Sequence, residues 1–167
     1  MAAPAEAERT RKVMSEAAFQ GLQVHNELDR VLVCRHLAEA WYLIGDPRRA
    51  ETLALEGLAL GERHSTFGPS FNLSCLLAEL YWRQGKTGRA GFFWEEARHI
   101  IGLGLPGQRL DLAVHHFLGA ELGLGKVAGD TGEAGRLMAA ELAEIDNEDG
   151  RKILRGFRCY GEIIKLV

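Results

Sequence analysis

Apolar residues recur at the 3.6-residue spacing of an α-helix along most of the chain. In residues 28–44 the spacing predicts a buried set made of Val31, Cys34, Leu37, Ala38 and Trp41. In residues 69–84 a second copy of the pattern predicts the equivalent set Phe71, Ser74, Leu77, Ala78 and Tyr81. Few residues are β-branched, so the pattern predicts an all-α fold.

The repetition continues into the segments that follow these two helices. Residues 37–50 read LAEAWYLIGDPRRA, and residues 77–90 read LAELYWRQGKTGRA, so leucine, alanine, glutamate, glycine and arginine recur at equivalent positions. A looser third copy, GDTGEA, begins at Gly129, which corresponds to Gly85 of the second copy. The period of about 40 residues is typical of helical repeat proteins.

Each repeated glycine is predicted to end a helix in the left-handed conformation that other residues resist. The turn around each such glycine is called a corner below, and the three corners are centred on Gly45, Gly85 and Gly129. Side-chain oxygens that are expected to cap the next helix belong to Asp46, Thr87 and Asp130. Pro47 suits the first helical position. Small residues that let two helices approach closely follow at Ala50, Ala90 and Ala134. Each corner therefore predicts an antiparallel helical hairpin.

The second helix of each hairpin carries its own apolar set. After the first corner the residues expected to be buried are Leu53, Ala54, Gly57, Leu58 and Gly61. After the second corner they are Phe93, Trp94, Ala97 and Ile101, and after the third they are Ala134, Leu137, Met138, Leu142 and Ile145. When the chain is compared with itself at a shift of one repeat, the N-terminal helix aligns with these second helices. The alignment predicts that Val13, Ala17 and Gly21 face inward. In the third repeat, Gly123 and Gly125 are expected to end the helix at 108–125 early.

The segment RQGKTGRAG at 83–91 also contains Gly-Lys-Thr, which ends a phosphate-binding loop. Such a loop needs another glycine five residues before Gly85, and Leu80 occupies that position. The repeated corner explains the segment better. We therefore expect neither a nucleotide site nor any other cofactor.

A chain of 167 residues fits a single domain. Its predicted parts are an N-terminal helix at 5–25, hairpins at 28–64, 69–104 and 107–146, and a capping helix at 150–167. The last helix places on one stripe Ile153, Phe157, Tyr160 and Ile164. A helix that covers the open end of a repeat array explains this stripe. An amphipathic helix that binds a partner is the alternative.

The pattern of a small residue, an aromatic residue, a corner glycine and an alanine five residues later resembles the tetratricopeptide repeat (TPR) family. The period of about 40 residues is similar to the longer variants in the sensor regions of bacterial regulators and signalling ATPases. This resemblance implies a right-handed superhelical stack of antiparallel hairpins, a TPR-like α-solenoid of seven or eight helices. It also implies that the first helix of each hairpin lines a concave groove where partner proteins bind.

Residues on the groove side of the first helices are the expected partner-binding set. They are Arg35, Glu39, Tyr42, Asn72, Glu79, Trp82, Arg83 and His116, with Leu32, Leu43 and Cys75 beside them. Tyr42 and Trp82 either bind the partner or pack between neighbouring hairpins, and both interpretations stay open. Relatives that clamp a peptide carboxylate use lysine and asparagine, whereas glutamate stands here at 39 and 79. A partner with basic residues among apolar ones is therefore favoured.

Charge and residue chemistry argue against several other functions. A net charge of −3 gives no basic field for nucleic acid. No apolar run is long enough to span a membrane, and the opening MAAPAEAERTRKVM lacks a signal-peptide core, so a cytoplasmic location is expected. The three cysteines are widely separated, which favours neither disulfides nor zinc. His115 and His116 point about 100° apart on a helix and cannot readily share a metal ion.

We therefore expect a protein–protein interaction scaffold or adaptor that binds a partner peptide or helix in its groove. No nucleophile has a plausible base beside it, so enzyme activity is not expected. One alternative is a self-associating repeat protein, such as a homodimer, in which a second copy covers the edge left by the N-terminal helix. Another is the ligand-sensing domain of a transcriptional or signalling regulator.

Overall fold

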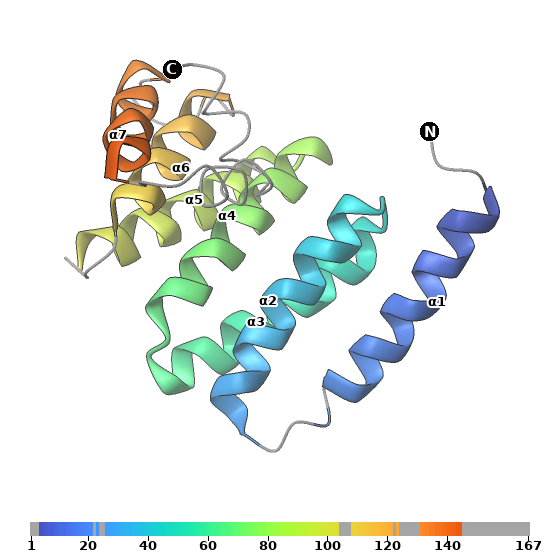
Figure 1. The fold of residues 1–167 in the computed structure, drawn as a ribbon. Helices are drawn as coiled ribbons and strands as arrows, with labels where there is room; N and C mark the ends of the chain where they lie inside the picture. The colour runs from blue at the N-terminus through green and yellow to red at the C-terminus, as the bar shows by residue number, and fades with distance from the viewer. Residues whose placement is uncertain are drawn as a thin grey trace. The chain divides into compact units, whose positions relative to one another are not determined.

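The computed structural model describes residues 4–21, 23, 26–103, 108–121, 123 and 131–144. Within these ranges every regular element is an α-helix (Figure 1), which confirms the predicted all-α class. The helices of the described residues are α1 (Pro4–Gly21), α2 (Glu27–Leu43), α3 (Pro47–His64), α4 (Phe67–Arg83), α5 (Thr87–Gly102), α6 (Gln108–Glu121) and α7 (Thr131–Glu144). The corner expected at Gly129 and the capping helix expected at 150–167 lie outside the described residues.

The chain divides into two compact units, Met1–Leu80 and Tyr81–Val167, and the boundary falls within α4. In the first unit α2 and α3 lie side by side, and α1 runs beside α2 (Figure 1). In the second unit α6 contacts both α5 and α7. No helix among the described residues is long and apolar enough to cross a membrane.

The first corner has the geometry predicted for a glycine that ends a helix. Gly45 has a φ of +82°, and its N–H donates to the carbonyl oxygen of Tyr42 at 3.1 Å. The N–H of Asp46 donates to the carbonyl oxygen of Trp41 at 2.9 Å. These two bonds form the Schellman motif, which satisfies carbonyl groups at the end of α2. Ala50 follows in the first turn of α3 and is fully buried.

The second corner repeats each of these features at the equivalent positions. Gly85 has a φ of +72°, and its N–H donates to the carbonyl oxygen of Trp82 at 2.8 Å. The N–H of Lys86 donates to the carbonyl oxygen of Tyr81 at 2.9 Å. Ala90 is again fully buried. The same residue types at the same spacing therefore fold into the same local structure.

The caps of the two following helices differ. Asp46 caps α3 as predicted, because its Oδ1 accepts a hydrogen bond of 3.1 Å from the N–H of Arg49, and Pro47 is the first helical residue. The cap predicted for Thr87 is wrong, since Thr87 is the first residue of α5 and Lys86 occupies the cap position. A lysine side chain carries no acceptor, so α5 begins without a side-chain cap.

The core of the first unit confirms the predicted face of α2, all five members of which are buried. Gly57 of α3 packs against this face. A Cβ atom at Gly57 would lie 2.8 Å from Cδ1 of Leu73 and 2.9 Å from Cβ of Cys34. Only a glycine lets the backbone of α3 come this close to its neighbours. Burial also raises the pKa of the Cys34 thiol to about 11.

The equivalent face of α4 is buried as predicted. Its members Phe71, Ser74, Leu77, Ala78 and Tyr81 are all buried. The apolar pattern of the first helices was therefore a reliable guide to their inward faces in both copies of the repeat.

Two of the residues expected in the core of the first unit lie elsewhere. Val13 is 56% exposed, because the described side chains of α1 at 8–16 are nearly all exposed and α1 is largely polar there. Leu58 is half-buried, and Leu60 is buried in its place. Leu60 shares the three- and four-residue spacing of Leu53 and Gly57, whereas Leu58 lies outside that face.

A third left-handed residue, Ser65, ends α3 with a φ of +52°. Its N–H donates to the carbonyl oxygen of Gly61, and the N–H of Thr66 donates to the same oxygen at 3.0 Å. This turn leads directly into α4. The sequence reading did not identify it, because a serine carries no strong signal for a positive φ.

In the second unit, burial is more selective than the apolar pattern predicts. Trp94 and Ala97 of α5 are buried, whereas Phe93 and Ile101 are half-buried. These two expectations were therefore only partly met.

The helix α7 buries only part of the set expected in its core, and α6 ends near the glycine that was expected to end it. Ala134 and Met138 of α7 are fully buried, whereas Leu137 and Leu142 are half-buried and Ile145 lies outside the described residues. The helix α6 ends at Glu121, and Gly123 has a φ of +61°. The early end predicted for this helix is thus confirmed.

Candidate functional site

Three large apolar side chains stand exposed along one face of α2. Leu28, Leu32 and Leu43 have exposed fractions of 46%, 42% and 66%. Glu39 lies on the same face and is half-buried, with no hydrogen bond or ion pair among the described residues. These four residues are called the α2 stripe below. The stripe combines apolar area with a carboxylate that no described residue engages.

Tyr42 and Glu79 meet at the edge of this stripe. The Tyr42 hydroxyl donates a hydrogen bond to Oε1 of Glu79, which joins α2 to α4 within the first unit. Glu79 is buried although it carries a carboxylate. A buried carboxylate is costly without hydrogen-bond donors, so the Tyr42 hydroxyl stabilises it.

The other predicted residues of the first unit are held in different ways. Arg35 is half-buried, and its Nε has no hydrogen-bond partner in the described part of the chain. Asn72 donates its Nδ2–H to the carbonyl oxygen of Gly68 at 3.0 Å, so part of its capacity is used within α4. Cys75 is buried.

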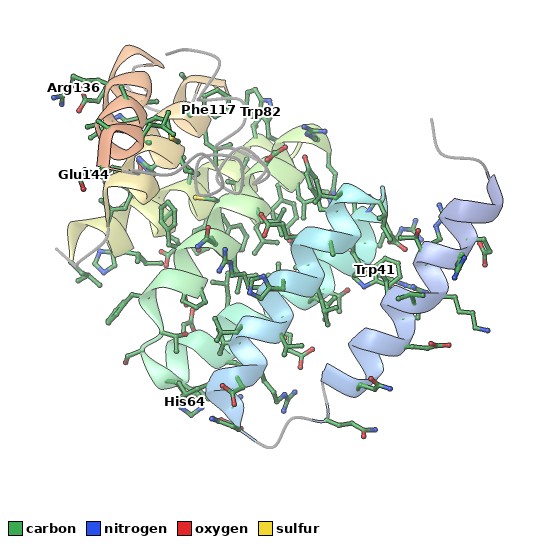
Figure 2. All side chains as sticks on the ribbon, in the orientation of Figure 1. Trp41, His64, Trp82, Phe117, Arg136 and Glu144 are labelled. Atoms are coloured by element: carbon green, nitrogen blue, oxygen red, sulfur yellow. The ribbon has the colours of Figure 1, made fainter. Side chains whose placement is uncertain are left out.

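Three predicted residues belong to the second unit. Trp82, labelled in Figure 2, is half-buried, Arg83 is exposed and His116 is half-buried. His116 contacts its neighbour His115 edge to face, with 6.1 Å between the ring centres.

His115 is a buried histidine that stacks on Trp94, with 4.6 Å between the ring centres. Its Nε2 is buried without a hydrogen-bond partner in the described residues. Burial lowers the pKa of His115 to about 4, and the nearby His116 acts in the same direction. His115 is therefore neutral near pH 7 and packs as an aromatic ring. Within the described ranges, no three or more His, Cys, Asp or Glu residues are grouped so that they could hold a metal ion.

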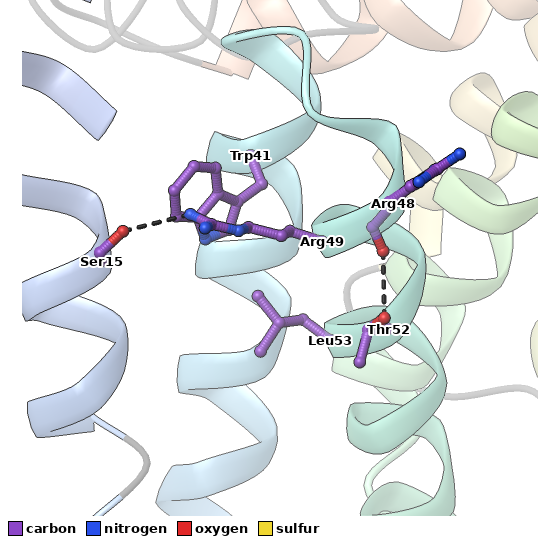
Figure 3. A pocket seen from close by; sticks show the side chains of 6 residues that line it. All are labelled: Ser15, Trp41, Arg48, Arg49, Thr52 and Leu53. Atoms are coloured by element: carbon purple, nitrogen blue, oxygen red, sulfur yellow. Dashed lines mark hydrogen bonds between the residues drawn. The ribbon is translucent and has the colours of Figure 1, made fainter. Parts of the chain in front are cut away.

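A pocket of about 380 Å³ opens in the first unit beside α1, α2 and α3 (Figure 3). Its lining residues are Ser15, Trp41, Arg48, Arg49, Thr52 and Leu53. Trp41 and Leu53 are buried, and the other four are exposed, so the pocket has an apolar floor and a polar rim.

Arg49 occupies the centre of this rim. Its guanidinium lies 4.4 Å from the centre of the Trp41 ring, and its Nη1 donates to the Ser15 hydroxyl at 3.1 Å (Figure 3). Its Nε lies 3.6 Å from Oδ2 of Asp46. The Arg48 guanidinium has neither a hydrogen bond nor an ion pair among the described residues. Arg49 therefore covers the rim beside Trp41, whereas the side chain of Arg48 points away from Trp41 and Leu53 (Figure 3).

The sequence reading treated these arginines only as part of the repeat and missed the pocket. A signal was present in the comparison of the two repeats. Thr52 and Leu53 correspond to Phe92 and Phe93 of the second repeat, so the first repeat has much smaller side chains at these positions.

Comparisons with protein-family models, with curated proteins and with solved structures give no match to this chain. The resemblance to the TPR family therefore remains an inference from the sequence of this chain.

Proposed function

We propose that the chain is a TPR-like scaffold that binds a segment of a partner protein and performs no catalysis. In this proposal its hairpins stack into a right-handed α-solenoid. The observation that carries the proposal is the recurrence of both Schellman hydrogen bonds, at Gly45 and again at Gly85. Such recurrence at a fixed spacing is expected when each hairpin is one unit of an array.

Contacts between α2 and α3 support an antiparallel hairpin. Near the start of α2, Glu27 forms a hydrogen bond with His64, the last residue of α3, which is labelled in Figure 2. Near the end of α2, Trp41 contacts Arg49 in the first turn of α3. A pair of helices that meets start to end in this way is the unit from which a TPR array is built.

The α2 stripe is the surface that best suits a partner. Burial of an exposed leucine side chain contributes about 1.5–3 kcal/mol, so two or three leucines suffice for an interface of moderate affinity. Leu32 and Leu43 are about three helical turns apart, and Glu39 lies between them. This spacing suits an amphipathic partner helix with apolar residues on both sides of a lysine or arginine.

Quantitative capture of partner proteins with matched variants tests the proposal. We expect Leu32→Glu/Leu43→Glu to lose the proteins that the wild type captures. Leu55→Glu is the control, because Leu55 is a similarly exposed leucine, at 41%, but lies on α3. Unchanged capture by a folded Leu32→Glu/Leu43→Glu variant would contradict the assignment of the α2 stripe.

The charge of the partner is tested separately. We expect Glu39→Lys to weaken capture more than Glu39→Gln, since the first change creates repulsion with a basic partner and the second only removes attraction. Sedimentation of the same variants over a range of concentrations shows whether the partner is a second copy of the chain.

A further inference from the structure

We propose that the partner bound at the α2 stripe is the α2 stripe of a second copy of this chain, with the two helices antiparallel. This inference rests on the proposed function, because it takes the α2 stripe as the partner surface and then names the partner. A two-fold interface uses the same residues of both copies, so the surface has to be complementary to itself. The α2 stripe meets this condition in its charges and in its leucines.

The charges on this face of α2 are a cation and an anion that do not pair with each other. At 100° per residue, Arg35 and the four residues of the stripe lie within about 80° of the helix circumference. Arg35 and Glu39 are both half-buried, and neither has a hydrogen bond or ion pair among the described residues. An arginine four residues before a glutamate is the less favourable order for a pair within one helix. Both charges therefore remain for a partner.

The leucines and the charges are arranged symmetrically about the same point of α2. The midpoint of Leu32 and Leu43 falls between residues 37 and 38, and the midpoint of Arg35 and Glu39 falls at residue 37. The two midpoints differ by half a residue, which is about 0.75 Å along the helix axis. A two-fold axis at this point places Leu32 opposite the partner's Leu43. The same axis places Arg35 opposite the partner's Glu39.

Only the antiparallel arrangement uses this symmetry. A parallel pair would place Arg35 against the partner's Arg35 and Glu39 against the partner's Glu39, and like charges that face each other are repulsive. In the antiparallel pair, the leucine contact and the ion pair each occur twice. A foreign helix would require no such symmetry of the stripe. The shared midpoint therefore favours a second copy as the partner.

Sedimentation equilibrium of the purified chain tests the proposal. We expect the average mass of the wild type to rise toward that of a dimer between low micromolar and near-millimolar concentration. Leu32→Glu/Leu43→Glu should weaken self-association by at least about a hundredfold, because four exposed leucine side chains leave the interface. Leu55→Glu on α3 is the control, and it should associate like the wild type.

Charge variants test the pairing of Arg35 with the partner's Glu39. Arg35→Glu sets two carboxylates against each other, and Glu39→Arg sets two guanidinium groups against each other. We expect each variant alone to self-associate at least about tenfold more weakly than the wild type. An equimolar mixture of the two should form a mixed dimer about as tight as that of the wild type, since each copy then supplies the opposite charges. Arg48→Glu makes the same charge change at an exposed position of α3, and it should have no effect.

Far-UV circular dichroism shows whether the variants keep their helices. Glu39→Arg and the double leucine variant test the interface without a change at the half-buried Arg35. Three results would overturn the proposal: a wild type that stays monomeric at near-millimolar concentration, self-association that survives in Leu32→Glu/Leu43→Glu, or no mixed dimer from folded charge variants. Because these measurements contain no other protein, a monomeric wild type would leave the scaffold function standing. That function fails only if the double leucine variant still captures the same proteins.

Discussion

The guanidinium of Arg49 lies 4.4 Å from the centre of the Trp41 ring. The contact joins the last turn of α2 to the first turn of α3 across the corner at Gly45. Its equivalent in the second repeat is Arg89, which lies 5.2 Å from the centre of the Tyr81 ring and donates to the Tyr81 hydroxyl at 3.3 Å. In each of these two corners, an arginine side chain packs on a buried aromatic ring, and a left-handed glycine ends the first helix.

Replacement of Arg49 should weaken the first unit. We expect Arg49→Gln to lower the free energy of unfolding by about 1 kcal/mol, because it removes a cation–π contact with a buried ring and the hydrogen bond to Ser15. Urea unfolding measures the change. Arg48→Gln is the control and should stay within about 0.5 kcal/mol of the wild type, since Arg48 is exposed. Equal effects of the two changes would contradict the contact.

The corner glycines should be sensitive to the presence of a Cβ atom. At Gly45 and Gly85 an added Cβ would meet nothing within 4 Å, so only the positive φ opposes a substitution. We expect Gly45→Ala and Gly85→Ala each to cost about 1–2 kcal/mol. Asparagine tolerates the left-handed conformation better, so Gly45→Asn should cost less than Gly45→Ala. A reversed order, measured by urea unfolding, would speak against the left-handed assignment.

Gly57 should be sensitive for a different reason, which is lack of space. Gly57→Ala would place a methyl group 2.8 Å from Leu73 and 2.9 Å from Cys34. Overpacking of this kind costs about 1–3 kcal/mol and outweighs the gain in helix propensity of up to about 1 kcal/mol. Gly88 of α5 is also helical but has open space, so Gly88→Ala should be neutral or stabilising. We therefore expect the unfolding temperature to fall in Gly57→Ala and to stay the same or rise in Gly88→Ala.

His115 should make stability depend on pH. Its pKa in the folded state, about 4, lies below its usual value of 6.5, mainly because of burial. Of the charged groups near it, His116 and Arg98 lower the pKa further and Glu95 raises it. The unfolded chain therefore binds the proton first as the pH falls. Above pH 6.5 His115 is neutral in both the folded and the unfolded chain, so it does not change the free energy of unfolding. As the pH falls from 6.5 to 4, the free energy of unfolding decreases by up to about 3 kcal/mol.

Urea unfolding at a series of pH values measures this loss, and His115→Phe is the matched variant. Phenylalanine can still stack on Trp94 but cannot take up a proton. We expect the variant to lose less stability than the wild type between pH 6.5 and 4.5. The same slope in both proteins would show that His115 does not titrate during unfolding in this range.

The repeat period and the helix boundaries near the corners could be read from the sequence because they depend on local interactions. The face of α2 that includes Val31 and Trp41 follows from a spacing of three and four residues. A corner such as Gly45 depends on hydrogen bonds between near neighbours in the chain. The cap at Thr87 failed although it too is local, because the position equivalent to Asp46 in the second repeat is Lys86 and not Thr87.

Contacts between helices could not be predicted from the apolar pattern of the sequence. The bond between Tyr42 and Glu79 and the stacking of His115 on Trp94 each join two helices. Nothing in the local sequence distinguishes a glutamate that is buried against a tyrosine from one that faces solvent. The exposure of Val13 likewise depends on how closely α1 approaches its neighbours, which its own apolar period does not specify.

The sequence by itself thus determined that the chain is helical, that its corner motif recurs at a fixed spacing and where two of its helices turn. Only the tertiary structure decided that a pocket opens beside Thr52 and Leu53, and that Arg49 rather than Arg48 covers Trp41. The physical reason is that backbone hydrogen bonds and helical spacing act between near neighbours in the chain. Cavities, buried charges and side-chain stacking depend instead on the distance between helices.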